Sequence, residues 1–322
     1  MARLLLLALG ALAVLVLGIH LGATPLGPGR ILEALIRPDS ADATIVLSLR
    51  LPRVLLAFAV GAGLGLTGAA LQALVRNPLA DPYLLGLSGG AGLGAVLMIA
   101  LFTSGIWAVP LGAWVGALLA VALVYRLAVV AGRRLDPRIL LLAGVVVSAF
   151  TGAVMTVVLT LVPAPQLRNA FLWLLGGFST ASWQSLGIFA AYAVIPAGLL
   201  LLGARQLDLL ALGEEPAQYL GADVERSKRV VYFAASLLTA AAVAVCGVIG
   251  FVGLVMPHAM RRVMGPLHAR LLPAVLLASG SFLVLADGLA RTVVRPVELP
   301  VGAITATIGV PFFALMLRRS LR

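Results

Sequence analysis

The sequence predicts an all-α polytopic membrane protein with about ten transmembrane helices, and three observations support this prediction. Hydrophobic residues make up 62% of the 322 residues and the mean hydropathy is +1.12, whereas soluble domains are about 45–50% apolar. Only 11% of the residues are charged, and these fall between long apolar runs. Each run is expected to be helical, because a backbone exposed to lipid has no water to satisfy its amide groups.

The apolar runs follow one another along the whole chain. A helix of about 20 residues crosses a hydrocarbon core of about 30 Å. The runs that reach or approach this length are Leu4–Leu21, Val54–Val75, Tyr83–Phe102, Val109–Ala131, Ile139–Val162, Ser185–Leu202, Val230–Val245, the shorter Val248–Met260, Leu271–Ala290 and Val301–Leu317.

The first run, Leu4–Leu21, is interpreted as an uncleaved helix rather than a signal peptide. It is long for the apolar core of a signal peptide and lacks a clean A-x-A cleavage site. With the N-terminus in the cytoplasm, most of the 23 Lys and Arg residues fall on the cytoplasmic side, which agrees with the positive-inside rule. Both termini are therefore predicted to be cytoplasmic.

The stretch from Arg50 to Gly94 is predicted to organise the fold. Two glycine-rich runs flank a polar hinge, Arg76–Pro82, where we expect function. A four-residue spacing places small residues on one helix face, where a neighbouring backbone can approach closely in lipid. The glycines with this spacing are Gly61 and Gly65 on the first run, and Gly86, Gly90 and Gly94 on the second.

Three segments between the runs are predicted to have structure of their own. The external loop Gly22–Pro52 contains a short amphipathic helix at Gly29–Ile36. The segment Asn169–Phe178 is too short to span and is expected to insert halfway at the outer face. The longest cytoplasmic stretch is Arg205–Arg229.

Within that cytoplasmic stretch, Leu212–Gly221 is predicted to form a short helix. Glu214, Glu215 and Pro216 are typical of a first helical turn. Gly221 is typical of a left-handed C-terminal stop, and Asp223 of a cap on the next helix.

One alternative interpretation is an intramembrane serine protease that uses Ser88 and His258. Gly86–Gly90 matches the G-x-S-x-G pattern, although the nucleophile elbow needs a strand-to-helix turn that this chain does not predict. A Ser/His pair needs hydrogen-bond contact, and His258 is the histidine expected at the same membrane face as Ser88. The simpler interpretation of Ser88 is a small packing residue on a glycine-rich face.

Charge and motif content argue against other functions. No P-loop occurs and the only lysine is Lys228, so ATP hydrolysis would need a separate subunit. The lone Cys246 excludes an internal disulfide and a Cys-based metal cluster, and no metal site or catalytic residue is predicted. Asp287 and Arg291 are interpreted as a local i,i+4 pair. The near absence of charge within the spans argues against ion-coupled transport.

Arg50, Arg53 and Arg291 are predicted to lie outside the membrane on the external side. Single external arginines are usually solvated or bound to lipid phosphate. Three that cluster would instead form a basic patch able to dock acidic side chains of a soluble partner.

Several motifs, taken together and in order, carry a family resemblance. From about Arg50 onward the chain resembles the permease subunits of type II ATP-binding-cassette importers, which are the iron-siderophore, haem and vitamin B12 permeases. The motifs are Leu51–Arg53 (LPR), Asn77–Pro82 (NPLADP), Leu85–Gly92 (LGLSGGAG), Trp173–Phe178 (WLLGGF), Leu212–Glu214 (LGE), Gly250–His258 (GFVGLVMPH) and Glu298–Gly302 (ELPVG).

The resemblance implies one transmembrane permease domain over residues 1–322, with a cytoplasmic coupling loop at 205–229, in the bacterial inner membrane. The protomer would have ten helices and work as a homodimer. Two cytoplasmic ATPase subunits would carry the ATP and Mg, so this chain would hold no cofactor and would not itself be an enzyme. A periplasmic substrate-binding protein would deliver a bulky metal chelate.

The resemblance also implies roles for matching residues. Asn77, Leu79, Pro137 and Arg138 would form the cytoplasmic gate; Gly213, Glu214, Glu215 and Gln218 would contact the ATPase; and Arg50, Arg53 and Arg291 would dock the binding protein. Pro137–Arg138 replaces the small hydroxyl residues expected in a B12 permease. The expected cargo is therefore iron-siderophore or haem first, and cobalamin next.

Overall fold

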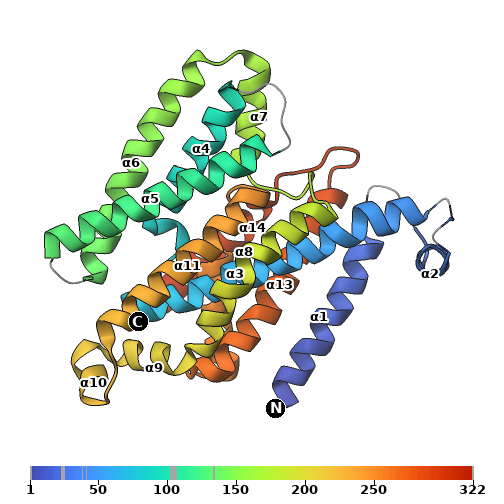
Figure 1. Ribbon diagram of the computed structural model, residues 1–322. Helices are drawn as coiled ribbons and strands as arrows, with labels where there is room; N and C mark the ends of the chain where they lie inside the picture. The colour runs from blue at the N-terminus through green and yellow to red at the C-terminus, as the bar shows by residue number, and fades with distance from the viewer. Residues whose placement is uncertain are drawn as a thin grey trace.

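The computed structural model describes residues 2–22, 26–37, 39–40, 42–101, 107–132 and 135–320, and these residues form helices and loops without any strand (Figure 1). The elements are α1 (Ala2–His20), α2 (Pro28–Ile36), the π-helix η1 (Thr44–Arg50), α3 (Leu51–Val75), the 3-10 helix η2 (Pro82–Leu85), α4 (Leu87–Leu101), α5 (Ala108–Gly132), α6 (Pro137–Leu161), α7 (Ala164–Leu174), α8 (Trp183–Leu202), α9 (Ala204–Leu212), α10 (Glu214–Tyr219), α11 (Val224–Cys246), α12 (Val252–Met264), α13 (His268–Thr292) and α14 (Val301–Ser320).

The all-helical membrane fold is confirmed. Within the described residues, seven helical segments are long and apolar enough to cross a membrane: α1, η1 with α3, α5, α6, α8, α11 and α13. Helices α4 and α14 are shorter apolar helices, and α12 has 13 residues. Each of the ten apolar runs of the sequence therefore coincides with a helix, while seven of these helices meet the length and hydropathy needed to span.

Several elements begin at residues other than those predicted, and in three of them the difference is four or five residues and follows from local backbone features. Helix α4 begins at Leu87 instead of Tyr83, because η2 ends at Gly86, whose φ of +80° breaks the helix. Helix α12 begins at Val252 after the non-helical Gly247–Gly250. The short outer helix, expected at Asn169–Phe178, is α7 and starts five residues earlier, after Pro163.

Helix α3 is the centre of the fold. Every residue from Val60 to Leu74 is buried, and α3 packs against α8, α11, α12 and α13. Gly61 and Gly65 face Ser279 of α13, and a Cβ at either glycine would collide with Ser279. This contact confirms that the four-residue glycine spacing marks a close helix–helix interface.

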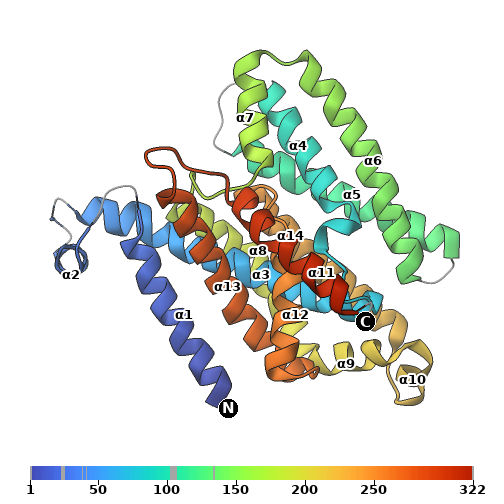
Figure 2. The ribbon, with the colours of Figure 1, turned by 180° about the vertical axis from the view of Figure 1, so that it is seen from behind.

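Helices α4–α7 lie on one side of this centre and helix α1 lies on the other (Figures 1 and 2). Helices α4–α7 lie together, and the backbones of Gly90 and Gly94 on α4 approach Gly116 and Gly112 on α5. Helix α1 lies at the opposite edge, packs mainly on α13, and buries only Ala11 and Gly18.

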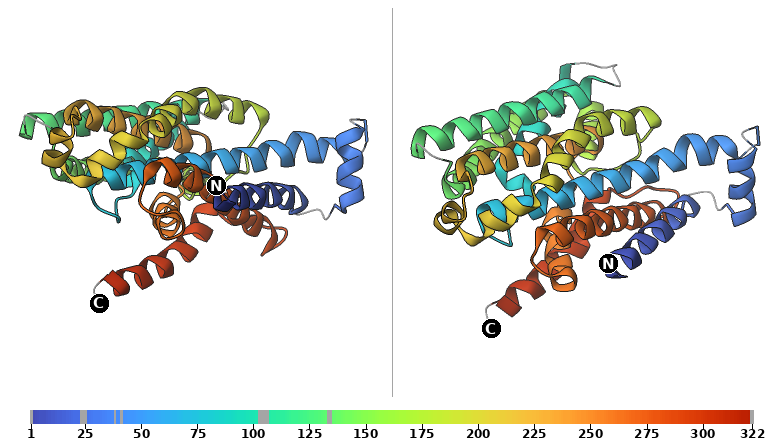
Figure 3. Two further views of the ribbon diagram at one scale, coloured as in Figure 1. Left: turned by 90° about the horizontal axis from the view of Figure 1, so that it is seen from below. Right: turned by 60° about the horizontal axis from the view of Figure 1, so that its bottom comes forward.

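The two ends of the molecule carry different features. Helix α1 begins and α14 ends toward the end at which α9 and α10 lie (Figures 1 and 2). Helix α2, η1 and the last turn of α13 lie at the opposite end. The C-terminal part of α14 projects away from the other helices (Figure 3).

Candidate functional site

The polar hinge between α3 and α4 is folded by its own side chains. Arg76 ends α3 in a left-handed conformation with φ of +53°. Asn77 Oδ1 accepts a hydrogen bond from the Leu79 amide at 2.9 Å, and Asp81 Oδ1 accepts one from the Tyr83 amide at 2.9 Å. Burial raises the pKa of the Asp81 carboxyl from 3.8 to about 6. The hinge is thus an ordered turn, as the sequence predicts.

The turn between α5 and α6 is capped in the same way. Asp136 Oδ1 accepts a hydrogen bond from the Arg138 amide at 2.8 Å, and Pro137 occupies the first helical turn. Pro137 is buried, whereas Arg138 is exposed. The cap therefore fixes the residue pair that the resemblance assigns to the gate.

The predicted short helix of the cytoplasmic stretch is α10, which has six residues. Glu214 and Glu215 lie in its first turn, and Ala217 is its buried residue. Gly221 follows with a φ of +81°, and Asp223 Oδ1 accepts a hydrogen bond from the Arg226 amide at 3.0 Å to cap α11. These details confirm the acidic first turn, the glycine stop and the following cap. The helix is shorter than the predicted Leu212–Gly221, because Leu212 ends α9.

Helix α10 has an exposed face, and the backbone conformation of Gly213 before it sets its direction. Tyr219 is 85% exposed, and Glu215 and Gln218 are also exposed. Gly213 is buried and has φ of +114° and ψ of 164°, a backbone conformation open essentially to glycine alone. Gly213 therefore sets the angle at which α10 leaves α9.

The hinge, the α5–α6 turn and α10 surround a common cavity of about 730 Å³. Among the predicted gate residues, Asn77, Pro137 and Arg138 line this cavity, and Glu214 of α10 joins them. Leu79 is not among its lining residues. The remaining lining residues are Val75, Arg76, Asp136, Ile139, Leu141 and Lys228.

The sequence prediction missed Lys228, which lies between these elements. Its side chain is 2% exposed, and its Nζ forms ion pairs with Glu214 Oε1 at 3.1 Å and Glu225 Oε1 at 2.6 Å. Nζ also donates to the Leu135 carbonyl at 2.7 Å. The sequence offered one signal, since Lys228 is the only lysine of a chain otherwise supplied with arginine.

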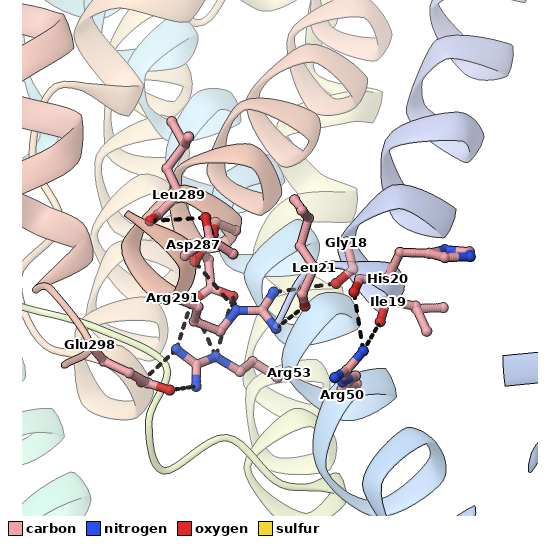
Figure 4. Close-up of polar contacts among 12 residues, drawn as sticks. Gly18, Ile19, His20, Leu21, Arg50, Arg53, Asp287, Leu289, Arg291 and Glu298 are labelled. Atoms are coloured by element: carbon pink, nitrogen blue, oxygen red, sulfur yellow. Dashed lines mark hydrogen bonds and ion pairs between the residues drawn. The ribbon is translucent and has the colours of Figure 1, made fainter. Parts of the chain in front are cut away.

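A second polar cluster lies at the opposite end of the molecule (Figure 4). Asp287, which is 1% exposed, pairs with Arg53 Nη2 at 2.9 Å and with Arg291 Nε at 3.0 Å. Arg53 also binds Glu298 in the loop before α14. The predicted i,i+4 pair of Asp287 and Arg291 is confirmed, and Arg53 shares its carboxylate.

The same cluster holds the end of α1 (Figure 4). Arg291 Nη1 donates to the Leu21 carbonyl at 2.8 Å and Nη2 to the Gly18 carbonyl at 3.3 Å. Arg50 Nη1 donates to the carbonyl of Ile19 at 2.9 Å. Two arginines thus satisfy carbonyls of the last turn of α1, which have no partner within that helix.

These contacts correct one assumption behind the predicted docking patch. Arg50, Arg53 and Arg291 do gather at one end, but Arg50 and Arg291 are each only 5% exposed and bind groups of this chain. Sequence reasoning treated all three as surface groups because it could not see Asp287, Glu298 and the end of α1 beside them. Of the three, Arg53 lies nearest to an exposed partner, Glu298.

The protease alternative has no support. Within the described residues, His258 Nε2 is buried without a hydrogen-bond partner, and no hydrogen bond joins Ser88 to His258. Ser88 lies in the first turn of α4, on the glycine-rich helix that packs against α5. The contact that a nucleophile and its base require is therefore missing.

The fold is that of a multi-pass helical membrane protein. The FecCD transport family matches residues 8–319, and the chain belongs to this family.

Relatives and a solved structure agree with this assignment. The chain is 44% identical over 281 residues to the cobalamin import system permease protein BtuC of Halobacterium salinarum, covering 87% of this chain and 75% of that protein. It is 40% identical over 322 residues to the hemin transport system permease protein HmuU of Yersinia pestis, covering 97% and 96%. A solved inward-facing structure, described as a metal-chelate type ABC transporter, superimposes with a TM-score of 0.90 at 29% identity over 99% of both chains.

Proposed function

We propose that this chain is the membrane-spanning permease subunit of an ATP-binding-cassette importer that carries a bulky metal chelate into the cytoplasm. The observation that supports this most directly is the meeting of Asn77, Pro137, Arg138 and Glu214 around one cavity. In a FecCD family member, this meeting supports a gate and a coupling helix that act together.

The energy source and the partners follow from what the sequence contains. The chain has no P-loop, and its resemblance to ATP-binding-cassette permeases implies two separate ATPase subunits, which bind ATP and Mg. Each ATPase receives α10, which presents Glu215 and Gln218 on an exposed face. A second copy of the permease completes the path on a twofold axis, with ten membrane helices in each copy.

The orientation follows from the distribution of positive charge. The protein lies in the bacterial inner membrane as a single permease domain, with both termini in the cytoplasm. The end that carries α9 and α10 then faces the ATPases, and the end that carries Arg53 faces a periplasmic binding protein. The ends of α1 and α14 nearest the termini lie on the α10 side, in keeping with this orientation (Figure 1).

The mechanism is conformational rather than chemical. ATP binding closes the ATPase dimer and displaces α10 as a rigid element, and the hinge and the α5–α6 turn respond by opening or closing the path. Movements of packed rigid elements of this kind are a common basis of switching. No bond chemistry is assigned to the permease.

The proposed cargo is an iron-siderophore or haem, with cobalamin next. Relatives named for cobalamin, hemin and Fe(3+)-citrate import match at 44%, 40% and 36% identity, and so support the chelate class more than one member of it. The preference for iron chelates depends on Pro137–Arg138, which replaces the small hydroxyl residues expected of a B12 permease.

The test is uptake by a strain that lacks this permease and its chromosomal relatives. Haem, a ferric siderophore and cobalamin are supplied in turn, with the permease restored from a plasmid together with its ATPase and binding protein. We expect restored uptake of an iron chelate. Restoration of cobalamin uptake alone would overturn the cargo order, and restoration of none would overturn the importer assignment.

A further inference from the structure

Lys228 makes three polar contacts at one point between α10, α11 and the residues before α6. Its ammonium group donates hydrogen bonds to Glu214 Oε1 on α10 at 3.1 Å and to the Leu135 carbonyl before α6 at 2.7 Å. It also forms an ion pair with Glu225 Oε1 on α11 at 2.6 Å. Each contact thus joins Lys228 to a different place in the chain.

Leu135 is held through both of its backbone groups. Its carbonyl accepts from Lys228, and its amide donates to Glu225 Oε2 at 3.3 Å. The Leu135 side chain is also buried. Leu135 directly precedes Asp136, the cap that fixes Pro137 and Arg138. The first two turns of α11 therefore hold Leu135 through both its carbonyl and its amide.

Helix α10 depends on the same anchor. It has six residues and buries only Ala217, so its own packing does little to fix its position. At its first residue, Glu214 reaches Lys228. The Lys228 side chain is buried, whereas that of Glu214 is 36% exposed, so separating the pair leaves the buried ammonium with one fewer compensating charge. Displacement of α10 is therefore resisted unless Lys228 and Leu135 move with it.

We propose that Lys228 is a positioning residue that joins the coupling helix α10 to the α5–α6 turn, so that the two move as one unit when ATP is bound. This inference depends on the proposed function, since it assigns the link between the ATPase contact and the gate. Lys228 touches neither nucleotide nor cargo, and it acts through Glu214 and Leu135.

The experiment uses the complete transporter, reconstituted in liposomes with its ATPase and binding protein. Glu214→Gln removes the negative charge from one arm of the link and leaves the contacts of Lys228 with Leu135 and Glu225 in place. Lys228→Met removes all three arms. Glu33→Gln, which removes an exposed carboxylate from α2 at the other end of the protein, is the matched control. Cargo uptake and ATP hydrolysis are measured on the same vesicles.

We expect Glu214→Gln to lower the cargo moved per ATP hydrolysed by at least about fivefold, the lower end of typical coupling between sites. Lys228→Met should lower this ratio at least as far, and Glu33→Gln should leave it unchanged. An unchanged ratio in Glu214→Gln would overturn the proposal. A parallel loss of hydrolysis and uptake would also overturn it, because Glu214 would then act only in the ATPase contact.

A distance measurement decides the matter even if Lys228→Met assembles poorly. Spin labels are attached to cysteines at Arg138 and Tyr219, both exposed, in a background with the buried Cys246 replaced by alanine. The label separation should be the same with and without ATP in the otherwise unchanged protein, and should broaden in Glu214→Gln. If the label separation changes with ATP in the labelled protein that still has Glu214 and Lys228, the proposal is overturned. A wild-type complex without ATP-driven uptake would instead contradict the importer function itself.

Discussion

Arg53 binds both oxygens of Glu298 at once, with Nη1 3.0 Å from Oε1 and Nη2 3.0 Å from Oε2. Such a bidentate pair fixes geometry as well as charge. The opposite side of the same guanidinium is taken by Asp287, which is buried, whereas Glu298 is 41% exposed. Any carboxylate that approaches Arg53 from outside must therefore replace Glu298.

This relationship leads to a prediction for docking of the binding protein. Glu298→Gln should increase the association rate at low salt, because it removes the exposed negative charge beside Arg53 and leaves Asp287 shared between two arginines. Raised salt should reduce the difference. Surface plasmon resonance with the permease in nanodiscs measures both effects.

Glu33→Gln serves as the control for docking, since it removes another exposed carboxylate from the same end of the molecule. A slower association in Glu298→Gln would mean that Glu298 itself contacts the partner. Arg53→Glu is a better loss-of-docking variant than any change at Arg50, whose side chain holds the end of α1.

Asp287 is predicted to matter for stability more than for transport. Asp287→Asn removes the one carboxylate shared by Arg53 and Arg291. Breaking a buried ion pair from one side typically costs about 3–5 kcal/mol. Thermal unfolding in detergent should show a large fall in midpoint. Asp42→Asn, which opens the surface pair with Arg30, should change the midpoint little, and equal effects in the two variants would contradict the prediction.

Gly213 is predicted to set the position of α10. Gly213→Ala forces a side chain into a conformation with φ of +114°, beside Arg76 Nη1. Strain of this kind costs about 1–3 kcal/mol. Hydrogen exchange of the α10 amides should accelerate while the membrane helices stay protected. Gly198→Ala, in open space on α8, should leave exchange unchanged. Equal protection of α10 in both variants would argue against the role of Gly213.

Asp81 gives the hinge a dependence on pH. Its folded pKa, about 6, lies above the ordinary 3.8, so folding favours the neutral carboxyl. The stabilising contribution is complete below about pH 4 and is lost as the pH rises through about 6. Asp81→Asn keeps an acceptor for the Tyr83 amide but does not titrate. Wild-type stability should therefore rise, relative to this variant, between about pH 7 and pH 5. Parallel pH profiles would show that Asp81 does not titrate in this range.

Local features of this protein could be predicted from sequence because their causes are local. The lengths of the apolar runs predicted the helices. The acidic first turn and Gly221 predicted α10, and Asp223 predicted the start of α11. The glycine spacing on α3 gave its contact with α13, since in lipid only small residues permit such an approach.

The remaining features depend on contacts between residues far apart in the chain. Lys228 meets Leu135 across 93 positions, and Arg53 meets Asp287 across 234. A sequence pattern shows that these residues are charged but does not show which partners neutralise them. For this reason the docking prediction did not include the partners of Arg50 and Arg291 within this chain. The early break before α4 was missed because the left-handed conformation of Gly86 becomes evident only once η2 is formed.

The attachment of α1 has a consequence for the order in which the chain matures during synthesis. Arg50 follows its acceptor Ile19 by 31 positions, whereas Arg291 follows Leu21 by 270. After α1 has been synthesised, Arg50 is the first of the two arginines able to bind the carbonyls at the end of this helix. The second arginine, Arg291, is absent until α13 has been translated. The first helix to enter the bilayer is thus among the last to be locked in place.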